Sequence, residues 1–460
     1  MQFSTDESVS LLSRLIANRC VNDGTPDSGQ EVRNADTIEE YLDGSGVEVT
    51  RVEPHPGRVS VIFTVKGEDP DASPLSLLGH TDVVPADPAR WSRDPFSGEV
   101  ADGVVWGRGA IDMLNLTSAM AVVTKRIAER DRPPAADLVF AAVADEEAGS
   151  RFGVGWIEQN RPELLPWDNA ITESGGAHIP AGHAPTAGPV VTVTVGEKGG
   201  LPHRIVVRTA SGHASMPYGV DNAAVLIAEA VVRIARHRTP TQLDDSWRTL
   251  VRAHGFDERT ERALLDARTI DDHLHVFGSA SRFAHAVSHL TITPTILHSG
   301  EKSNVIPGAG QVDLDIRQLS GQSADDVDRE LRVALGDIGD RFDIVHLGSG
   351  NPSSSSTDTR LYRSLQNAVD TEFPGATTVP VLTGGGTDAR FVRKRGGNAY
   401  GFALFEPDWS IGRYRTLFHG EDEHIDINSL MRTTRALGHV VTDFLAPESA
   451  RSSQQERTSA

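Results

Sequence analysis

Three short apolar runs, each followed within a few residues by histidine or carboxylate, constrain the fold of this chain more than any other feature. The runs and their polar followers are residues 75–78 with His80, residues 138–143 with Glu146 and Glu147, and residues 169–172 with Glu173. Apolar runs of this length indicate buried strands. Open parallel sheets carry their functional residues just beyond the carboxyl ends of the strands. The pattern therefore predicts an α/β domain with a site along one sheet edge.

Helical and extended patterns alternate around these runs. Apolar residues at helical spacing predict helices, and shorter apolar stretches predict two further strands. The predicted helices span residues 8–19, 35–42 and 117–130, and the strands span residues 47–52 and 59–65. Near the end of the chain the same patterns return, with helices at 359–371 and 428–444 and strands at 379–382 and 399–404. Both ends of the chain are thus expected to build the same sheet.

The pattern changes near residue 197, where a smaller domain is predicted. Strands are expected at 203–209, 290–297 and 311–317, helices at 222–236 and 324–335, and a polar, irregular stretch from 237 to 283. This order predicts an α+β unit inserted into the first domain. We therefore expect a catalytic domain in two parts, 1–196 and 351–446, an inserted domain at 197–350, and a disordered tail at 447–460.

Seven side chains of the metal-ligand type lie in short motifs along the chain. They are His80, Asp82, Asp112, Glu146, Glu147, Glu173 and His419. Any one of them alone is more typical of a loop or of the first turn of a helix. Together, two imidazoles and three carboxylates suit two adjacent zinc ions, with one carboxylate as a bridge. Two of the five carboxylates then remain beside the metals, where catalysis would take place.

His80 and Asp82 are two residues apart, so their side chains point to the same side of an extended segment. Asp82 is then positioned to hold the free ring nitrogen of His80 and to fix its tautomer. Neighbouring side chains diverge, so Glu146 and Glu147 are expected to play different parts.

The composition of the chain excludes several classes of binding partner and indicates where the protein acts. A formal net charge of -20 argues against nucleic acid and anionic membranes. No apolar run approaches the length of a membrane span, and the first residues lack the basic and apolar regions of a secretory signal. The single cysteine, Cys20, excludes an intramolecular disulfide. We expect a cytoplasmic protein that acts on a small molecule.

From about residue 8 to about residue 445, the motifs resemble, in order, those of the two-zinc amidohydrolases. This family includes aminoacylase, glutamate carboxypeptidase, acetylornithine deacetylase and succinyl-diaminopimelate desuccinylase. The resemblance implies a mixed, mostly parallel catalytic sheet flanked by helices and interrupted by a lid and dimerisation domain. By motif, Asp112 would bridge the two ions, His80 and Glu173 would complete one, and Glu147 and His419 the other.

The resemblance also assigns roles away from the metals. Glu146 would be the general base, and Asp82 would orient His80. His213, in Ser-Gly-His-Ala-Ser, would steady the oxyanion from the partner subunit of a homodimer. Three further matches would bind substrate, namely Asn304, Arg317 and Thr387. The planar fork of an arginine suits a substrate carboxylate.

The expected reaction is hydrolysis of an amide bond in an N-acyl amino acid or at the C-terminal residue of a small peptide. Glutamate rather than aspartate at Glu173 favours deacylases and carboxypeptidases in the family, whereas a dipeptidase on the same centre is the alternative. A catalytically silent member would lack a ligand or the base, but all seven positions are filled. Two zinc ions are expected, with cobalt or manganese as alternatives. The acyl group, the preferred side chain and the role of residues 237–283 stay open.

Overall fold

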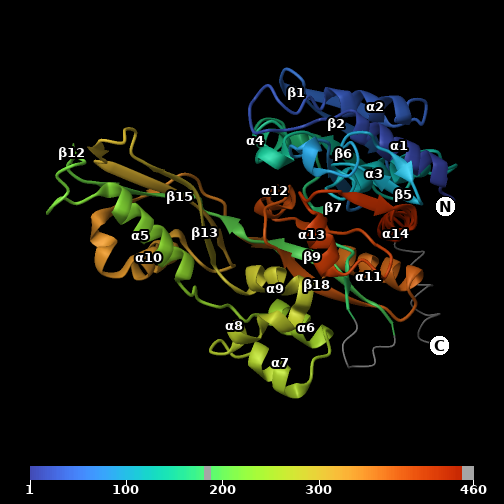
Figure 1. Cartoon of the computed structure of the whole chain (residues 1–460). Helices are drawn as coiled ribbons and strands as arrows, with labels where there is room; N and C mark the ends of the chain where they lie inside the picture. The colour runs from blue at the N-terminus through green and yellow to red at the C-terminus, as the bar shows by residue number, and fades with distance from the viewer. Residues whose placement is uncertain (181–187, 448–460) are drawn as a thin grey trace.

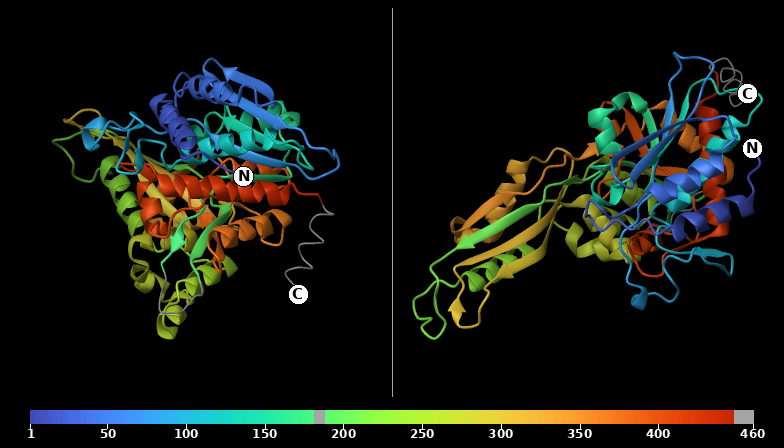
Figure 2. Two further views of the ribbon diagram at one scale, coloured as in Figure 1. Left: turned by 90° about the vertical axis from the view of Figure 1, so that its right-hand side faces the viewer. Right: turned by 90° about the horizontal axis from the view of Figure 1, so that it is seen from above.

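The computed structural model describes residues 1–180 and 188–447, and the chain forms a larger α/β body with an elongated lid projecting from it (Figures 1 and 2). The tail expected to be disordered lies, apart from residue 447, outside the described residues. Among the described residues, no helix is long and apolar enough to cross a membrane.

The larger body is built on one mixed sheet. Its strand order is β1 (Glu48–His55), β2 (Arg58–Val65), β6 (Leu138–Val143), β3 (Leu75–His80), β7 (Asn169–Thr172), β19 (Asn398–Gly401), β9 (Val190–Glu197) and β17 (Ser353–Ser354), and β8 (His178–Ile179) and β18 (Thr377–Thr383) also pair with β9. The pairs β6–β3, β3–β7, β7–β19 and β9–β18 are parallel. Strands from both ends of the chain therefore share one sheet, as the sequence predicted.

Helices cover both faces of this sheet, because alternate strand residues are buried on opposite sides. Leu77 and Phe140 belong to the core on one face, whereas their neighbours Leu78 and Ala141 belong to the core on the other. The first face is covered by α1 (Thr5–Ala17), α2 (Val32–Leu42), α3 (Leu114–Ala128), α11 (Arg360–Glu372) and α14 (Ile427–Phe444), and the second by α4 (Val154–Asn160) and α12 (Ala389–Lys394). A small sheet of β4 (Val100–Ala101), β5 (Val104–Trp106) and β20 (His424–Asp426), together with α13 (Ile411–Leu417), completes the body.

The lid is an antiparallel sheet with helices on one face (Figure 1). Its strands run β13 (Thr291–Ser299), β15 (Ala309–Gln318), β11 (His203–Arg208) and β16 (Phe342–His346), with β10 (Gly199–Gly200) also pairing β15, and its helices are α5 (Ala223–Arg236) and α10 (Ala324–Leu335). At its far end, β12 (Gly212–His213) pairs with β14 (Val305–Ile306). The lid has its own core, separate from that of the larger body, in which Ile205, Ile227 and Leu331 take part. The expected fold class is confirmed.

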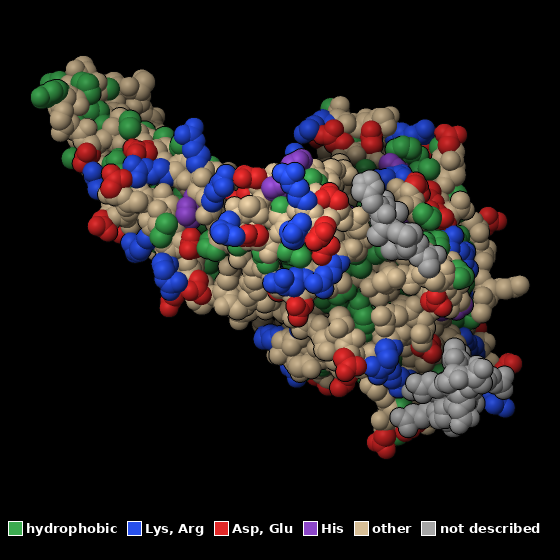
Figure 3. All heavy atoms as spheres, turned by 90° about the horizontal axis from the view of Figure 1, so that it is seen from below, with side chains coloured by type: hydrophobic (Ala, Val, Ile, Leu, Met, Phe, Trp, Pro, Cys, Tyr) green, Lys and Arg blue, Asp and Glu red, His purple; other side chains and the backbone are tan. Residues whose placement is uncertain are grey.

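Exposed apolar side chains are concentrated on the lid. Most of the large hydrophobic side chains that remain exposed among the described residues lie there, including Met216, which is 69% exposed, and Tyr218, which is 99% exposed. Figure 3 shows hydrophobic side chains gathered at the far end of the lid. Contiguous exposed apolar surface of this kind commonly marks an interface.

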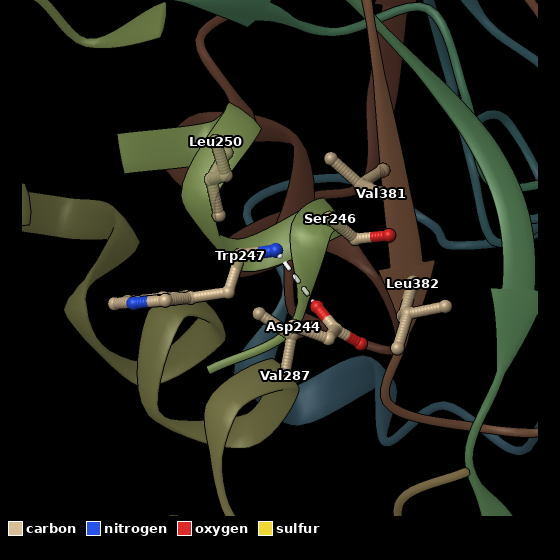
Figure 4. A pocket seen from close by; sticks show the side chains of 7 residues that line it. All are labelled: Asp244, Ser246, Trp247, Leu250, Val287, Val381 and Leu382. Carbon is tan, nitrogen blue, oxygen red and sulfur yellow. Dashed lines mark hydrogen bonds between the residues drawn. The ribbon is translucent and has the colours of Figure 1, made fainter. Parts of the chain in front are cut away.

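The prediction for residues 237–283 is wrong. This stretch is helical, with α6 (Asp245–Ala253), α7 (Glu258–Leu264) and α8 (Ile270–His273), and α9 (Ser281–Ser288) follows it. Although it lies within the expected inserted domain, 197–350, its residues Trp247, Leu250 and Phe277 belong to the core of the larger body. α6 packs against β18, and Figure 4 shows the small pocket at this contact, lined by Asp244, Ser246, Trp247, Leu250, Val287, Val381 and Leu382. The helices are short and largely polar, so the apolar residues at helical spacing were a weak sequence signal.

Candidate metal centre

The carboxyl ends of three neighbouring strands carry the predicted polar residues to one sheet edge. His80 is the last residue of β3, Glu146 and Glu147 follow β6, and Glu173 follows β7. β6 and β7 lie on either side of β3 and run parallel to it, so these side chains meet. One ligand atom from each of His80, Glu146 and Glu173 lies within 4.8 Å of the other two.

Asp112 lies at the centre of this group and faces both histidines. Its Oδ1 is 3.1 Å from His80 Nε2, and its Oδ2 is 3.1 Å from His419 Nε2. A carboxylate with each oxygen directed at a different imidazole has the arrangement expected of a bridge between two ions.

Each of the other two predicted ligands, Glu147 and Glu173, lies near a different histidine. Glu147 Oε2 is 3.2 Å from His419 Nε2, whereas Glu173 Oε1 is 3.9 Å from His80 Nε2. Glu147 Oε1 is buried and has no hydrogen-bond partner among the described residues. A buried carboxylate oxygen without a donor is unfavourable, and a bound cation would satisfy it. The residues present therefore fit a pair of metal ions.

The electrostatics of the cluster agree with this fit. Burial, together with neighbouring carboxylates, raises the pKa of Glu147 to about 7 and the pKa values of Glu146 and Glu173 well above their usual range. The hydrogen bond to Asp112, followed by that to Glu147, raises the pKa of His419 to about 10. Protons are thus held where like charges crowd, and divalent cations would relieve the same repulsion.

Asp82 contacts His80 differently from the sequence expectation. His80 Nδ1 donates to the backbone oxygen of Asp82 at 2.9 Å, while the Asp82 carboxylate is 3.6 Å away. The carboxylate instead accepts the backbone N–H groups of Glu146 at 3.2 Å and Glu147 at 3.1 Å, and the side-chain amide of Asn22 at 2.8 Å. Asp82 therefore fixes both the His80 ring and the turn that carries the two glutamates.

Sequence reasoning missed the group that holds the Asp112 loop. Glu423 is buried and accepts the backbone N–H groups of Gly109, Ile111 and Asp112 at 3.1, 2.7 and 3.1 Å. Arg108 Nη1 donates to the same carboxylate at 2.6 Å. Two sequence signals were available. Glu423 lies only four residues after His419, and the segment that contains Asp112 also contains an arginine, Arg108.

Two predicted residues lie far from the metal cluster within the same chain. β12, which ends at His213, and the neighbouring β14 form the far end of the lid (Figure 1). His213 is exposed, and its Nδ1 lies 2.7 Å from Ser215 Oγ. The exposed Asn304 lies beside it, with its backbone oxygen accepting from Ala214 N at 3.0 Å. The structure brings these residues together with each other but not with the metal ligands.

Arg317 and Thr387 have partners within the chain. Arg317 lies near the larger body at the end of β15, where its Nε and Nη2 each donate to Asp315 at 2.9 Å. Thr387 is buried, and its hydroxyl donates to Glu197 Oε2 at 3.0 Å.

Two further arginines near the cluster had no role in the sequence analysis. Arg390 Nη1 lies 3.8 Å from Glu146 Oε1. Arg415, two residues before α13 ends, donates to Thr383 Oγ1 at 3.3 Å, and its buried Nε has no partner among the described residues. Burial lowers the pKa of Arg415. The negative charges of Glu173 and Asp112 act in the opposite direction. Arg390 ends the segment 384–390 that contains Thr387, whereas no motif included Arg415.

Comparison with known proteins agrees with this geometry. Residues 76–443 match the model of peptidase family M20/M25/M40. The probable carboxypeptidase S-like 2 of Dictyostelium discoideum is 26% identical over 397 residues, which cover 83% of this chain and 74% of the relative. The N-fatty-acyl-amino acid synthase/hydrolase PM20D1 of Homo sapiens is 28% identical over 379 residues, covering 80% and 74%. The crystal structure of the M20 metallo-carboxypeptidase Sso-CP2 from Sulfolobus solfataricus shares the fold, with a TM-score of 0.71, 18% identity and coverage of 96% and 99%.

Proposed function

The chain belongs to peptidase family M20/M25/M40, and we propose that it is a two-zinc hydrolase that releases an amino acid from an N-acyl amino acid or from the C-terminal end of a small peptide. The observation that carries this proposal is the position of Asp112, whose two oxygens each face a different buried or half-buried histidine.

In this proposal each ion has its own pair of ligands beside the shared Asp112. His80 and Glu173 would hold one ion, and Glu147 and His419 would hold the other. When bound, such a pair supplies a water of lowered pKa and a Lewis acid for an amide carbonyl. Cobalt or manganese would suit the same carboxylate-rich set.

Glu146 is the proposed general base. Burial raises the pKa of its carboxyl well above the usual range, which favours a group that takes up a proton near neutral pH. The Asp82 carboxylate holds the Glu146 backbone N–H at 3.2 Å, so the turn is fixed. Glu146 would take a proton from the attacking water and pass it to the leaving amine.

Substrate binding is proposed for Arg317, Asn304 and Thr387, with Arg317 binding the substrate carboxylate. Asn304 lies beside His213, so it would contact the substrate of the partner subunit. The Arg317 side chain is 35% exposed, so its guanidinium is accessible even with Asp315 beside it. The printed names of the two relatives, a carboxypeptidase and an N-fatty-acyl-amino acid hydrolase, support a product that is a free amino acid.

We further propose a cytoplasmic homodimer in which His213 of one subunit completes the site of the other. The distance along the lid between β12 and the larger body, together with the exposed apolar surface beside His213, supports this arrangement (Figures 1 and 3). The buried, unpaired Cys20 is compatible with a cytoplasmic location.

The decisive experiment offers the zinc-loaded protein one pool of N-acyl amino acids and unblocked dipeptides, with products identified by mass spectrometry. Acyl groups should range from acetyl to fatty acyl, because chain length is the variable that the relatives suggest. We expect free amino acids mainly from the acylated substrates.

The matched control is the zinc-loaded Glu146→Gln protein, which identifies turnover by any contaminating hydrolase. Turnover confined to unblocked dipeptides would overturn the deacylase assignment in favour of a dipeptidase. Absence of turnover with every substrate, despite full zinc occupancy, would contradict the proposed reaction.

A further inference from the structure

A second cluster of metal-ligand side chains lies on the lid, away from the centre described above. His203, on β11, pairs directly opposite His346, on β16. Asp328, on α10, reaches both of them from the helix that covers this face of the sheet. One ligand atom from each of the three lies within 4.8 Å of the other two.

The separations fit a single small cation. Asp328 Oδ1 is 3.2 Å from His203 Nε2 and 3.0 Å from His346 Nε2. Tetrahedral ligands at about 2.0–2.1 Å from a zinc ion lie about 3.3 Å from one another. Both printed distances lie within a few tenths of an ångström of this separation, and the ligand atoms of the two histidines lie within 4.8 Å of each other.

The position of the ring proton on His203 distinguishes a metal site from an ordinary hydrogen-bonded group. His203 Nδ1 lies 2.7 Å from the backbone oxygen of Leu201, which can only accept, so this nitrogen carries the ring proton. In a neutral ring Nε2 then carries a lone pair, and this lone pair faces the Asp328 carboxylate. Two acceptors at 3.2 Å repel unless a proton or a metal ion lies between them.

The surroundings of this lone pair favour a divalent ion. The His203 side chain is 0% exposed, and its ring centroid is 4.2 Å from that of His346. The second imidazole also directs a ring nitrogen at the same carboxylate, at 3.0 Å. A divalent ion instead uses the lone pairs of both rings and the charge of Asp328 at once.

We propose that His203, His346 and Asp328 form a third metal site, for a divalent transition-metal ion of the zinc type. Two imidazoles and one carboxylate match this ion's preferred donors. The His346 side chain is 46% exposed, so the fourth position faces solvent.

The site would stabilise the end of the lid that joins the larger body. β11 begins where the chain has just left the larger body, and β16 ends where the chain returns to it, with Leu347 N donating to Pro202 O at 2.8 Å. An ion there would connect these two strands to α10. It would therefore limit movement of this helix relative to the lid sheet.

The test is the zinc content of the full-length protein, measured by mass spectrometry of the metal after gel filtration. His346→Ala and Asp328→Asn should each hold one zinc equivalent fewer than the unsubstituted chain. His298→Ala is the matched control, because His298 is exposed on β13, the opposite edge strand of the same sheet, and its zinc content should be unchanged.

Equal zinc content in all four proteins would overturn the proposal and leave a protonated His–Asp–His group. If His346→Ala fails to fold, the milder His346→Gln replaces it. A second readout is cobalt absorption, in which the visible bands lost on His346→Gln report the lid site. Because neither measurement uses hydrolysis, failure of the third site would leave the proposed reaction untouched, and the reverse also holds.

Discussion

At the scale of single residues, the metal centre depends on burying more carboxylates than the protein alone can neutralise. Glu146, Glu147 and Glu173 lie around Asp112, and burial raises the pKa of each glutamate. Separate carboxylates this close cannot all remain charged without cations between them. The arrangement therefore favours binding of divalent ions, and Glu146 is the glutamate that we propose for proton transfer.

Replacing Glu146 by glutamine should remove the base and leave the metals in place. We expect kcat to fall about 100- to 10,000-fold, the usual contribution of a positioned general base. Zinc content should match that of the unsubstituted protein, because the proposed ligands are intact. A variant that loses activity together with zinc would instead mark Glu146 as a ligand.

The single cysteine gives a pH-dependent test of the fold. Burial raises the pKa of the Cys20 thiol from 9.0 to about 12. Between these values the folded protein keeps a proton that the unfolded chain has released, so the free energy of unfolding should fall as pH rises. At about pH 8 the native thiol should resist a thiol reagent and react at once after addition of urea. Rapid labelling of the native protein would contradict the burial.

At the scale of elements, the proposed metal ligands lie on loops at one sheet edge. Side chains from distant parts of the chain fix the conformation of these loops. The turn after β6 is fixed by Asp82, and the loop before α3 is fixed by Glu423, which follows α13. Parallel strands place their ends together, but only these hydrogen bonds orient the side chains that follow.

Glu423 should behave as a positioning residue. Glu423→Gln places an amide nitrogen against Arg108 and leaves a buried charge without its partner, which should cost about 3–5 kcal/mol of stability. Zinc affinity should fall as well, because the backbone of Asp112 loses its anchor, and Glu423→Asp should restore neither fully. Isothermal calorimetry with zinc and urea unfolding measure the two effects.

The control for this prediction is Glu421→Gln. Glu421 is half exposed and pairs with the exposed Arg90, so its replacement should change neither quantity appreciably. Unchanged zinc affinity in Glu423→Gln would show that the loop holds its shape without this carboxylate.

At the scale of the whole molecule, the lid separates residues that the chemistry would need together. His213 lies on β12 at the far end of the lid, while the metal ligands lie on the sheet edge of the larger body. A second subunit resolves this separation if the lids associate through their exposed apolar surface, because a twofold interface delivers each lid to the other body.

Mixed dimers test this arrangement directly. His213→Ala and Glu146→Gln proteins should each be nearly inactive, whereas co-expression of the two should restore about one quarter of the unsubstituted activity. The reason is that half of the dimers contain both chains, and each of these has one site with neither substitution. If His213 served its own chain, every site would be defective and no activity would return.

The sequence by itself determined many of the longer strands, the polar residues that follow three of them, and the class of site. It did not predict β9 in the larger sheet or β16 in the lid. These depend on local periodicity and on the rule that parallel strands end at one edge, so the positions of His80, Glu146, Glu147 and Glu173 followed from short segments. The expected bridge and base are consistent with the geometry, but their roles stay predictions.

Only the tertiary structure decided the features that depend on residues far apart along the chain. Glu423 reaches the Asp112 loop across more than 300 residues, α6 joins the core of the larger body although its neighbourhood is polar, and His203 meets His346 through strand pairing. Each of these contacts depends on the three-dimensional packing of separate elements. A local pattern does not specify the partner, because burial and pairing are set by the surface that lies opposite.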